Sequence, residues 1–323
     1  MDKFDVACLG DATQDLFFFI DDASVFCDLD TAVCELTLRY AQKISVNKFA
    51  RSVGGNAANV SVGLTRLGLN VALVTALGNC GTGEWIKQEL EKEKVSLDFV
   101  KTDLDRDSNI SAILVYKGER TILSYHGDGG DRPEIVPPAN WLYVSRSAGR
   151  NSGELFAVAI GLKKTDESLK IAFNPSEKDL KIPPENLDVL LKITDVLILN
   201  RDEGMTLIGE KFSQLTNGEL SWADGLRFIA EEISKKGPKI VAITDGSMGA
   251  VVLKEQDFCC QMAKPANVVE TTGAGDAFFS GFLAAQVYSL DLKTSLKWGI
   301  ANSAGAVSQI GGVKGLLTKN EIS

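Results

Sequence analysis

The chain has 323 residues, of which 45% are hydrophobic and 24% are charged, as is ordinary for a globular protein. Its formal net charge of -9 at pH 7 argues against a broad surface for nucleic acid or for an anionic membrane. A small anionic ligand is still compatible with this charge, because a local group of backbone amides can hold phosphate in an acidic protein.

The N-terminal apolar stretch is interrupted by Asp11, Asp15 and Asp21, so it fits neither a signal peptide nor a membrane span. We therefore expect a cytoplasmic protein. The six cysteines show no C-x-x-C pairing, and we expect free thiols in a reducing compartment, with disulfides or a metal site as the alternative. They are Cys8, Cys27, Cys34, Cys80, Cys259 and Cys260.

Short apolar runs alternate with helical patterns along the chain. The apolar runs are typical of strands buried on both faces, and they span residues 4–9, 71–76, 141–145, 170–173, 195–199 and 239–244. The helical patterns span residues 57–67, 83–93, 153–164, 222–235, 274–288 and 292–308. This order predicts an α/β fold with a doubly wound, mostly parallel sheet and helices on both faces. No linker-like segment interrupts it, so we expect a single domain over residues 1–323.

Two stretches do not fit the alternation. Residues 15–52 begin with a very apolar run and lack a helical crossover, and residues 108–126 indicate two strands around a turn at Lys117-Gly118-Glu119. We interpret both as strands of a small β lid inserted into the fold, with an ordinary extension of the sheet edge as the alternative. Because extra strands with an apolar face often pair across a two-fold axis, a homodimer through the lid is a further hypothesis.

The most informative stretch is TTGAGDAF at residues 271–278. Glycines and small residues precede a helical apolar pattern there, and the free amides at the start of a helix form a site for an anion. An aspartate would repel that anion unless it acts as a base on a neighbouring group. We therefore assign the amides of Gly273, Ala274 and Gly275 to a phosphoryl group and Asp276 to proton removal. The alternative is a plain helix start with a stabilising acid in its first turn.

Other polar residues stand where ligands gather in a parallel sheet, at the carboxyl ends of its strands. Asp11 follows the first strand, and its carboxylate suits hydroxyl groups, although an aspartate after glycine is also a common turn. Gly54 and Gly55 would let a ligand approach the backbone before the first long helix. Asn59 would lie in the first turn of that helix with its amide turned to hydroxyls.

Two further strand ends carry weaker signals. Asn200 and Glu203 suit phosphate-bound water or hydrated Mg²⁺, or else a capping box at a helix start. Thr244, Gly246 and Gly249 permit a close approach by a nucleotide, or else form a plain hairpin.

Taken together and in this order, the segments resemble the PfkB/ribokinase family of carbohydrate kinases, along nearly the whole chain. The family's C-terminal signature, DTTGAGD-x-F, matches ETTGAGDAF at residues 270–278. Its N-terminal signature, GG-x-x-x-N-x-A followed by RLG, corresponds to GGNAANVS at residues 54–61, where Ser61 replaces the usual Ala, and to RLG at residues 66–68. The N-x-x-E and T-x-G-x-x-G patterns match at residues 200–203 and 244–249.

The resemblance implies ATP and Mg²⁺ as cofactors and a role for each matched position. Asp276 would be the general base, and residues 273–275 the anion hole. Sugar hydroxyls would contact Asp11, Gly54, Gly55 and Asn59. The nucleotide would contact Asn200, Thr244, Gly246 and Gly249, with Asn302 on its adenine side, and Glu203 would serve the metal ion.

Two departures from the family pattern qualify these implications. Glu270 replaces the usual Asp near a loop that binds a monovalent cation in many members, which argues against activation by K⁺. Asn56 stands where ribokinases tend to carry Lys, so ribose is not favoured over fructose or another sugar. The absence of a Lys at position 56 also argues against a sugar phosphate as substrate, unless Lys48 and Arg51 supply the positive charge instead.

The sequence thus predicts an ATP-dependent kinase acting on a primary hydroxyl of a small sugar. A nucleoside kinase is the first alternative, with Phe17, Phe19 or Tyr125 as the wall against the base. A non-catalytic sugar or nucleotide sensor on the same fold is the second, since a fold alone does not fix function. A dehydrogenase is disfavoured because no G-x-G-x-x-G follows the first strand.

Overall fold

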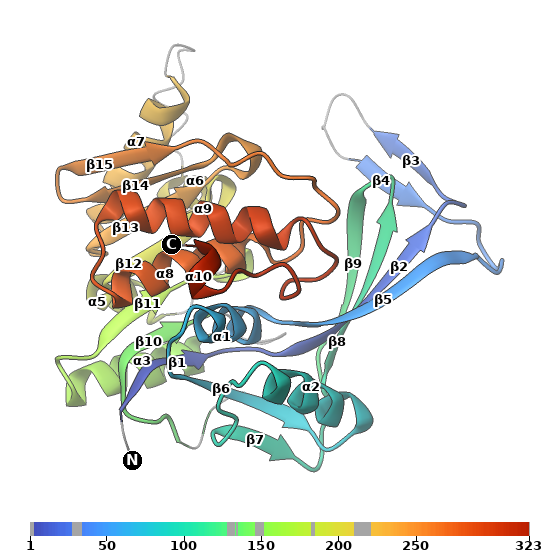
Figure 1. Cartoon of the computed structure of the whole chain (residues 1–323), viewed down its shortest axis with the longest axis horizontal. Coiled ribbons are helices and arrows are strands. Elements are labelled where there is room, and N and C mark those ends of the chain that lie inside the picture. Colours follow the sequence, from blue (N-terminus) through green and yellow to red (C-terminus); the bar gives the residue numbers. More distant parts are fainter. Residues whose placement is uncertain are drawn as a thin grey trace.

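The computed structural model describes residues 3–27, 34–127, 133, 135–145, 152–181, 185–209 and 221–322. Within these residues, a nine-stranded sheet has the order β15-β14-β13-β12-β11-β10-β1-β6-β7 (Figure 1). All neighbours from β13 to β7 are parallel, and β14 and β15 are antiparallel. The strands are β1 (Phe4–Leu9), β6 (Val71–Gly78), β7 (Val100–Asp103), β10 (Ala139–Val144), β11 (Lys170–Phe173), β12 (Val196–Asn200), β13 (Ile240–Thr244), β14 (Ala250–Lys254) and β15 (Asp257–Gln261).

Helices cover both faces of this sheet, as the alternating pattern predicts. Along β1, Val6 and Cys8 face one hydrophobic core and Ala7 and Leu9 face the other, so the strand is buried on both sides. The first core includes residues of α1, α8 and α9, and the second includes residues of α3, α5 and α7. The helices are α1 (Asn56–Arg66), α2 (Gly81–Lys92), α3 (Gly153–Thr165), α4 (Glu177–Lys181), α5 (Leu187–Ile193), α6 (Arg201–Ile208), α7 (Trp222–Ser234), α8 (Ala274–Val287), α9 (Leu292–Ala306) and α10 (Lys319–Ile322).

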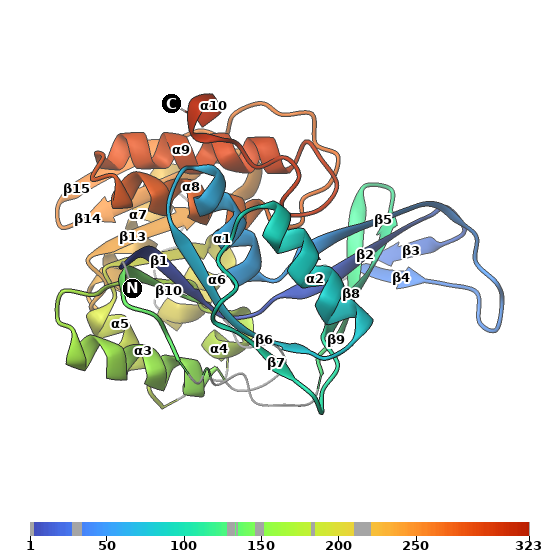
Figure 2. The same cartoon turned by 60° about the horizontal axis from the view of Figure 1, so that its bottom comes forward.

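The stretches that do not fit the alternation form a separate four-stranded sheet, which we call the lid sheet. It has the order β5-β2-β8-β9 and comprises β2 (Thr13–Ile20), β5 (Val46–Gly54), β8 (Asn109–Tyr116) and β9 (Glu119–Tyr125). Figures 1 and 2 show it projecting from the side of the main sheet. The turn between β8 and β9 is made by Lys117 and Gly118, which both have positive φ, as a two-residue hairpin requires.

The register of the lid sheet sorts its side chains into rows. Asp15 on β2 pairs with Ser52 on β5 and with Ser111 on β8, and Ser111 pairs with Ser124 on β9. Because side chains alternate between the faces of a strand, this polar row shares one face with the next row, which centres on Phe17. Phe17 is fully buried against Ile310, so this face of the lid sheet packs on the body of the protein.

A short hairpin of β3 (Ser24–Cys27) and β4 (Cys34–Thr37) lies at the far end of the lid sheet (Figure 1). Cys27 and Cys34 pair directly in its register and form a disulfide, with their Cα atoms 4.0 Å apart. The expectation of six free thiols is therefore wrong for these two residues. The spacing in the sequence did not reveal the bond, because only the pairing of the two strands brings the sulfur atoms together.

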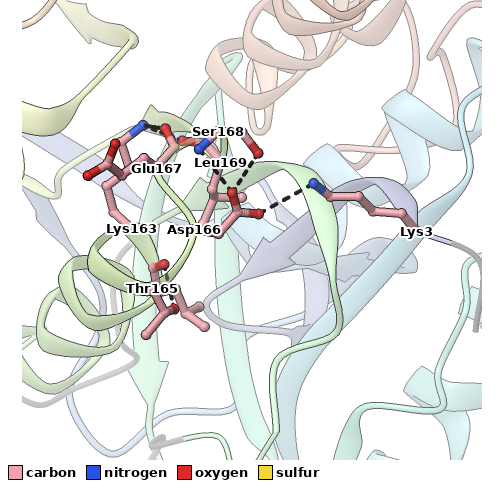
Figure 3. A network of polar contacts seen from close by, with 8 residues as sticks. Lys3, Lys163, Thr165, Asp166, Glu167, Ser168 and Leu169 are labelled. Atoms are coloured by element: carbon pink, nitrogen blue, oxygen red, sulfur yellow. Dashed lines mark hydrogen bonds and ion pairs between the residues drawn. The ribbon is translucent and has the colours of Figure 1, made fainter.

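A polar network fixes the turn between α3 and β11 to the N-terminal strand (Figure 3). Asp166 accepts hydrogen bonds from the amide and the hydroxyl of Ser168, at 2.9 and 2.5 Å, and pairs with Lys3 at 3.4 Å. The Ser168 hydroxyl is the main cause that lowers the pKa of Asp166, with Lys3 adding to it. Lys163 donates to two backbone carbonyls of the same turn.

In the part of the chain that the structure describes, no helix combines the length and the apolar character that crossing a membrane requires.

Candidate active site

The helix α8 begins on the glycine turn that the sequence singles out, and we call residues 271–276 the glycine loop. Gly273 is the N-cap residue in the left-handed conformation, with φ 76°. The amides of the first helical turn have no intrahelical partners, although the Ala274 amide donates to the Thr271 carbonyl at 3.3 Å. A Cβ atom on Gly273 would lie 2.5 Å from the Cα atom of Gly312, so only glycine fits between the loop and residues 311–312.

The two family signatures meet at Asp276. Asn59, which lies in the first turn of α1 and is buried, donates a hydrogen bond from Nδ2 to Oδ2 of Asp276 at 2.8 Å. The side-chain oxygen of Asn59, Oδ1, is buried and has no hydrogen-bond partner among the described residues. Two motifs separated by 217 positions thus place an amide and a carboxylate side by side at the start of two helices.

Asp11 is almost fully buried between β1 and α1. Its Oδ1 atom accepts a hydrogen bond from the Asn56 amide at 2.9 Å, and its backbone carbonyl accepts one from the Ala58 amide at 3.2 Å. Asp11 therefore caps α1 from another segment of the chain, and in doing so fixes the helix that carries Asn59. The sequence analysis expected either a contact with substrate hydroxyls or a turn at this position, and not a helix cap.

Gly54 and Gly55 allow close approaches, but the approaching atoms belong to the protein. A Cβ atom on Gly55, which has φ 89°, would lie 2.7 Å from the Ala12 Cα atom. A Cβ atom on Gly54 would lie 2.1 Å from Oδ2 of Asp15. Because both positions are glycine, the end of β5 can lie close against the start of β2, its neighbour in the lid sheet.

Asp15 is a candidate site residue that the sequence analysis did not assign to the site. It is 5% exposed, and the Thr13 hydroxyl donates to its Oδ1 atom at 2.9 Å. Burial raises the pKa of Asp15 to about 6; hydrogen bonds from Thr13 and Ser111 oppose this shift, and the charges of Asp11 and Glu270 add to it. The signal in the sequence was a lone carboxylate at an inward-facing position of an otherwise apolar strand.

This pKa predicts how stability varies with pH. The pKa of Asp15 rises from 3.8 to about 6 on folding, so the native state binds the proton more tightly than the unfolded state. The free energy of unfolding should therefore fall as pH rises through this window, by up to about 3 kcal/mol, and stay lowered above it. Asp15→Asn should abolish the fall, measured as urea midpoints between pH 4 and 8. Parallel pH profiles for both proteins would refute this account.

A substitution at Gly54 tests the packing on Asp15. Gly54→Ala should cost about 1–3 kcal/mol of stability, because the new methyl group overlaps the Asp15 carboxylate. Asp15→Ala removes the overlapping atoms, so the same change should cost much less in that background. A double-mutant cycle by chemical denaturation measures the difference, and additive effects of the two substitutions would contradict the contact.

Tyr143 on β10 is a second residue that sequence reasoning did not single out. It is fully buried, its ring packs edge-on against Phe279 of α8 with centroids 4.7 Å apart, and its hydroxyl has no hydrogen-bond partner in the described structure. Burial raises the pKa of Tyr143 well above its ordinary value, and the nearby charges of Asp276 and Asp11 raise it further. A neutral phenol therefore lies close to both carboxylates.

Asn200 and Glu203 form the capping box that was the alternative to a ligand site. The Asn200 side chain accepts from the Glu203 amide, and Glu203 Oε2 accepts from the Asn200 amide, both at 2.8 Å. Burial raises the pKa of Glu203, the Asn200 hydrogen bond opposes this, and the charges of Glu177 and Asp202 add to it. The capping box occupies one carboxylate oxygen of Glu203. The start of a helix is therefore enough to explain the N-x-x-E pattern at residues 200–203.

The strand ends β12 and β13 lie side by side, so Asn200 pairs with Thr244 in the sheet register. Residues 244–249 form the expected hairpin between β13 and β14, which includes a short 3-10 helix at Gly246–Met248. A Cβ atom on Gly246 would meet nothing within 4 Å, so space for a ligand exists there. A Cβ atom on Gly249 would lie 2.2 Å from the Gln261 carbonyl, so that glycine is required for packing against β15.

The predicted contact of Asn302 with the adenine side of the nucleotide stays a prediction, and its side chain already has partners within the protein. It is fully buried in α9, where its amide donates to the Ala277 carbonyl and to the Ser280 hydroxyl, both at 3.0 Å. Its carbonyl oxygen accepts from the Leu317 amide at 2.8 Å. These bonds account for the asparagine by packing of α8 and α9, and we do not include it in the proposed nucleotide site.

The described residues contain no group of three or more His, Cys, Asp or Glu side chains that would hold a metal ion. A Mg²⁺ site would not require such a group, because Mg²⁺ is usually held by one or two carboxylates together with substrate phosphates and water, and the Mg²⁺ prediction stays a prediction. Glu203 has one oxygen outside its capping box and suits contact with such a hydrated ion. Glu270 is buried, with Oε1 accepting from the Thr272 amide at 2.6 Å, and the prediction against K⁺ stays a prediction.

Comparison with known proteins identifies the family and the fold of the chain. The model of the pfkB family of carbohydrate kinases matches residues 15–319, so the chain belongs to that family. The fructokinase of Klebsiella pneumoniae is 28% identical over 246 residues, which cover 72% of this chain and 76% of that protein.

Two solved structures share the fold along the whole chain. Arabidopsis thaliana ribokinase, solved with ribose and ATP, has a TM-score of 0.78 at 20% identity and covers 99% of this chain and 98% of its own. A nucleoside kinase of Methanocaldococcus jannaschii has a TM-score of 0.73 at 18% identity and covers 100% and 98%. The comparisons confirm the predicted ribokinase-like α/β fold and the class of enzyme, a sugar or nucleoside kinase of this family.

Proposed function

We propose that the chain transfers the terminal phosphoryl group of ATP to a primary hydroxyl of a small sugar, with Asp276 as general base. The observation that carries the proposal is the contact between Asn59 and Asp276 beside the first-turn amides of α8. A carboxylate held at 2.8 Å by a buried amide has a fixed direction next to a site for negative charge. A plain stabilising acid at a helix start needs no such partner.

The proposed reaction divides between the acid and the amides. Asp276 accepts the proton of the attacking hydroxyl, and the amides of residues 273–275 donate to the phosphoryl oxygens as charge shifts onto them. The Ala274 amide would exchange its 3.3 Å bond to Thr271 for one to phosphate. Mg²⁺ bound to the nucleotide phosphates would neutralise part of their charge, with Glu203 and Asn200 contacting it through water. Thr244 and Gly246 would lie along the nucleotide.

The sugar would lie between the lid sheet and α1. Asn59 has an unpartnered carbonyl oxygen, Asp15 carries a carboxylate, and Ser52, Ser111 and Ser124 share a row with Asp15. Hydrogen-bonding groups at this density suit a polyol. Asp11 would act mainly by holding α1, and Gly54 and Gly55 by letting the lid sheet approach.

The residues expected to form an aromatic wall for a nucleoside do not assemble into one. Phe17 is buried in the contact between the lid sheet and Ile310. The ring of Phe19 is covered by Lys48, whose ammonium nitrogen lies 5.2 Å from the ring centroid. Tyr125 pairs with Ile110, and Ile110 pairs with Gln14, so the side chains of Tyr125 and Gln14 share a face of the lid sheet. Because Gln14 and Asp15 are consecutive, that face is opposite to the face of Asp15. This arrangement favours a free sugar as acceptor over a nucleoside.

A competition assay tests the choice of acceptor. ADP release from ATP would be measured with a panel of free hexoses and pentoses, alone and in mixtures with adenosine, inosine and cytidine. We expect a sugar to stimulate ADP release and nucleosides to compete weakly. Preference for a nucleoside would establish the first alternative, and ATP turnover that no acceptor changes would favour the non-catalytic sensor.

We also propose that the chain forms a homodimer through the lid sheet. Its edge strand β9 exposes Ile122, Leu123 and Tyr125, with 44%, 58% and 50% of their surfaces accessible. An exposed apolar edge strand is a ready surface for pairing with a second copy. Analytical ultracentrifugation of Leu123→Lys against the parent chain tests it, and an unchanged mass would contradict pairing through β9.

A further inference from the structure

A cavity lies at the edge of the lid sheet, and Val269 of its wall comes two residues before the glycine loop. It has a volume of about 700 Å³ and is bounded by β5, Val269, residues 308–310 and Lys314. Such a volume is typical of sites for small molecules. None of its lining residues is Asp11, Asp15, Asn59 or a member of the glycine loop, and none is acidic.

Three cations line this cavity, namely Lys48, Arg51 and Lys314. In the part of the chain that the structure describes, none of the three pairs with a carboxylate. The chain has more acidic than basic residues, 43 against 34. A cavity wall that carries basic side chains and no acidic ones therefore differs from the net negative charge of the whole chain. Unpaired cations that converge on one cavity create a local positive potential, which attracts anions.

The two cations of β5 also contact aromatic rings, which do not themselves line the cavity. Lys48 lies over the Phe19 ring at 5.2 Å and Arg51 over the Trp85 ring at 4.8 Å. The two residues face opposite sides of β5, and both reach the cavity because β5 is the edge strand of the lid sheet.

The third cation is fixed through its backbone. Arg66 donates to the Lys314 carbonyl at 3.3 Å and to the Leu316 carbonyl at 2.9 Å. Arg66 is itself held by two hydrogen bonds to the Glu93 carboxylate, at 2.8 and 2.7 Å. The segment that carries Lys314 is therefore anchored to α1 without using the Lys314 ammonium group.

We propose that this cavity binds a small polyanion of the phosphate-ester class, at a site separate from the candidate active site. Lysine and arginine are the side chains that bind phosphate oxygens, and three of them suit a ligand with more than one negative charge. Ile310, which lines the cavity, directly precedes residues 311–312, and Gly312 lies against both Gly273 and Asn59. An occupant would therefore touch the segment that supports the glycine loop.

Pyrophosphate is a suitable probe, titrated into the full chain by calorimetry at constant ionic strength. The triple variant Lys48→Gln, Arg51→Gln, Lys314→Gln keeps the glycine loop intact, so it separates this cavity from any binding at that loop. We expect its affinity for pyrophosphate to fall by about tenfold or more, as loss of hydrogen bonds between charged groups predicts. Lys293→Gln, which replaces an exposed lysine of α9, is the matched control and should leave the affinity unchanged.

Should the triple variant fail to fold, Lys314→Gln alone supplies the comparison, because the Lys314 side chain is exposed and makes no ion pair with any described residue. We expect it to weaken pyrophosphate binding measurably without changing the melting temperature of the free protein. Equal affinity in the parent and the variants would overturn the proposal. Citrate bound as tightly as pyrophosphate would overturn the assignment to phosphate chemistry.

Discussion

Replacing Asp276 with asparagine is expected to lower turnover by about 10²- to 10⁴-fold, the range that general-base catalysis contributes. The amide keeps an oxygen that can accept the 2.8 Å hydrogen bond from Asn59, so the local structure should persist. Binding of sugar and of ATP should stay nearly unchanged, because the lost function is proton removal. Steady-state kinetics and calorimetric binding on the same preparations separate the two effects.

A matched control distinguishes the catalytic reading of Asp276 from that of a stabilising acid. Asp224 occupies the first turn of α7, as Asp276 does in α8, and is the structural equivalent without a proposed role. Asp224→Asn should leave turnover unchanged. If Asp276→Asn retained near-normal turnover, or if both variants lost it equally, Asp276 would not be the base.

Gly275→Ala should give opposite changes in activity and in stability. A Cβ atom on Gly275 would meet nothing within 4 Å in the protein, and alanine favours helix over glycine by about 0.5–1 kcal/mol. The folded protein should therefore be unchanged or slightly stabilised. Turnover should nevertheless fall by about 10²-fold or more, because the methyl group crowds the phosphoryl group against the amides that hold it.

Gly81→Ala supplies the control for Gly275→Ala. Gly81 is the first residue of α2, and a Cβ atom there also meets nothing within 4 Å. This variant should change neither turnover nor the melting temperature by much. Full activity of Gly275→Ala would show that no ligand approaches the backbone at Gly275, and the anion hole would have to lie elsewhere.

Much of the main sheet could be predicted from the sequence, because its strands are short, apolar and buried on both faces. Residues 4–9 and 170–173 match β1 and β11 to the residue, and the other expected strands are displaced by one or two positions. The lid strands were expected from the absence of a helical crossover. Their register, which places Asp15 beside Ser52 and Ser111, depends on contacts between distant segments and is not written in local periodicity.

In the candidate site too, some features follow from the local sequence and others depend on contacts between distant segments. The glycine turn before Asp276 and the position of Asn59 follow from motif and helix spacing. The roles of Asp11, Gly54 and Asn302 in packing could not be predicted, because each depends on an atom from a remote segment that fills the space expected for a ligand. Asp15 was missed because a carboxylate at an inward position of an apolar strand gives no local signal of what lies opposite it.

The most direct test of the proposed reaction is a single-turnover experiment followed by phosphorus NMR, with ATP and the sugar that most stimulates ADP release. The account predicts one phosphate ester of a primary hydroxyl for each ADP formed, and loss of that ester with Asp276→Asn. Inorganic phosphate in place of the ester, or an ester formed equally well by Asp276→Asn, would contradict it.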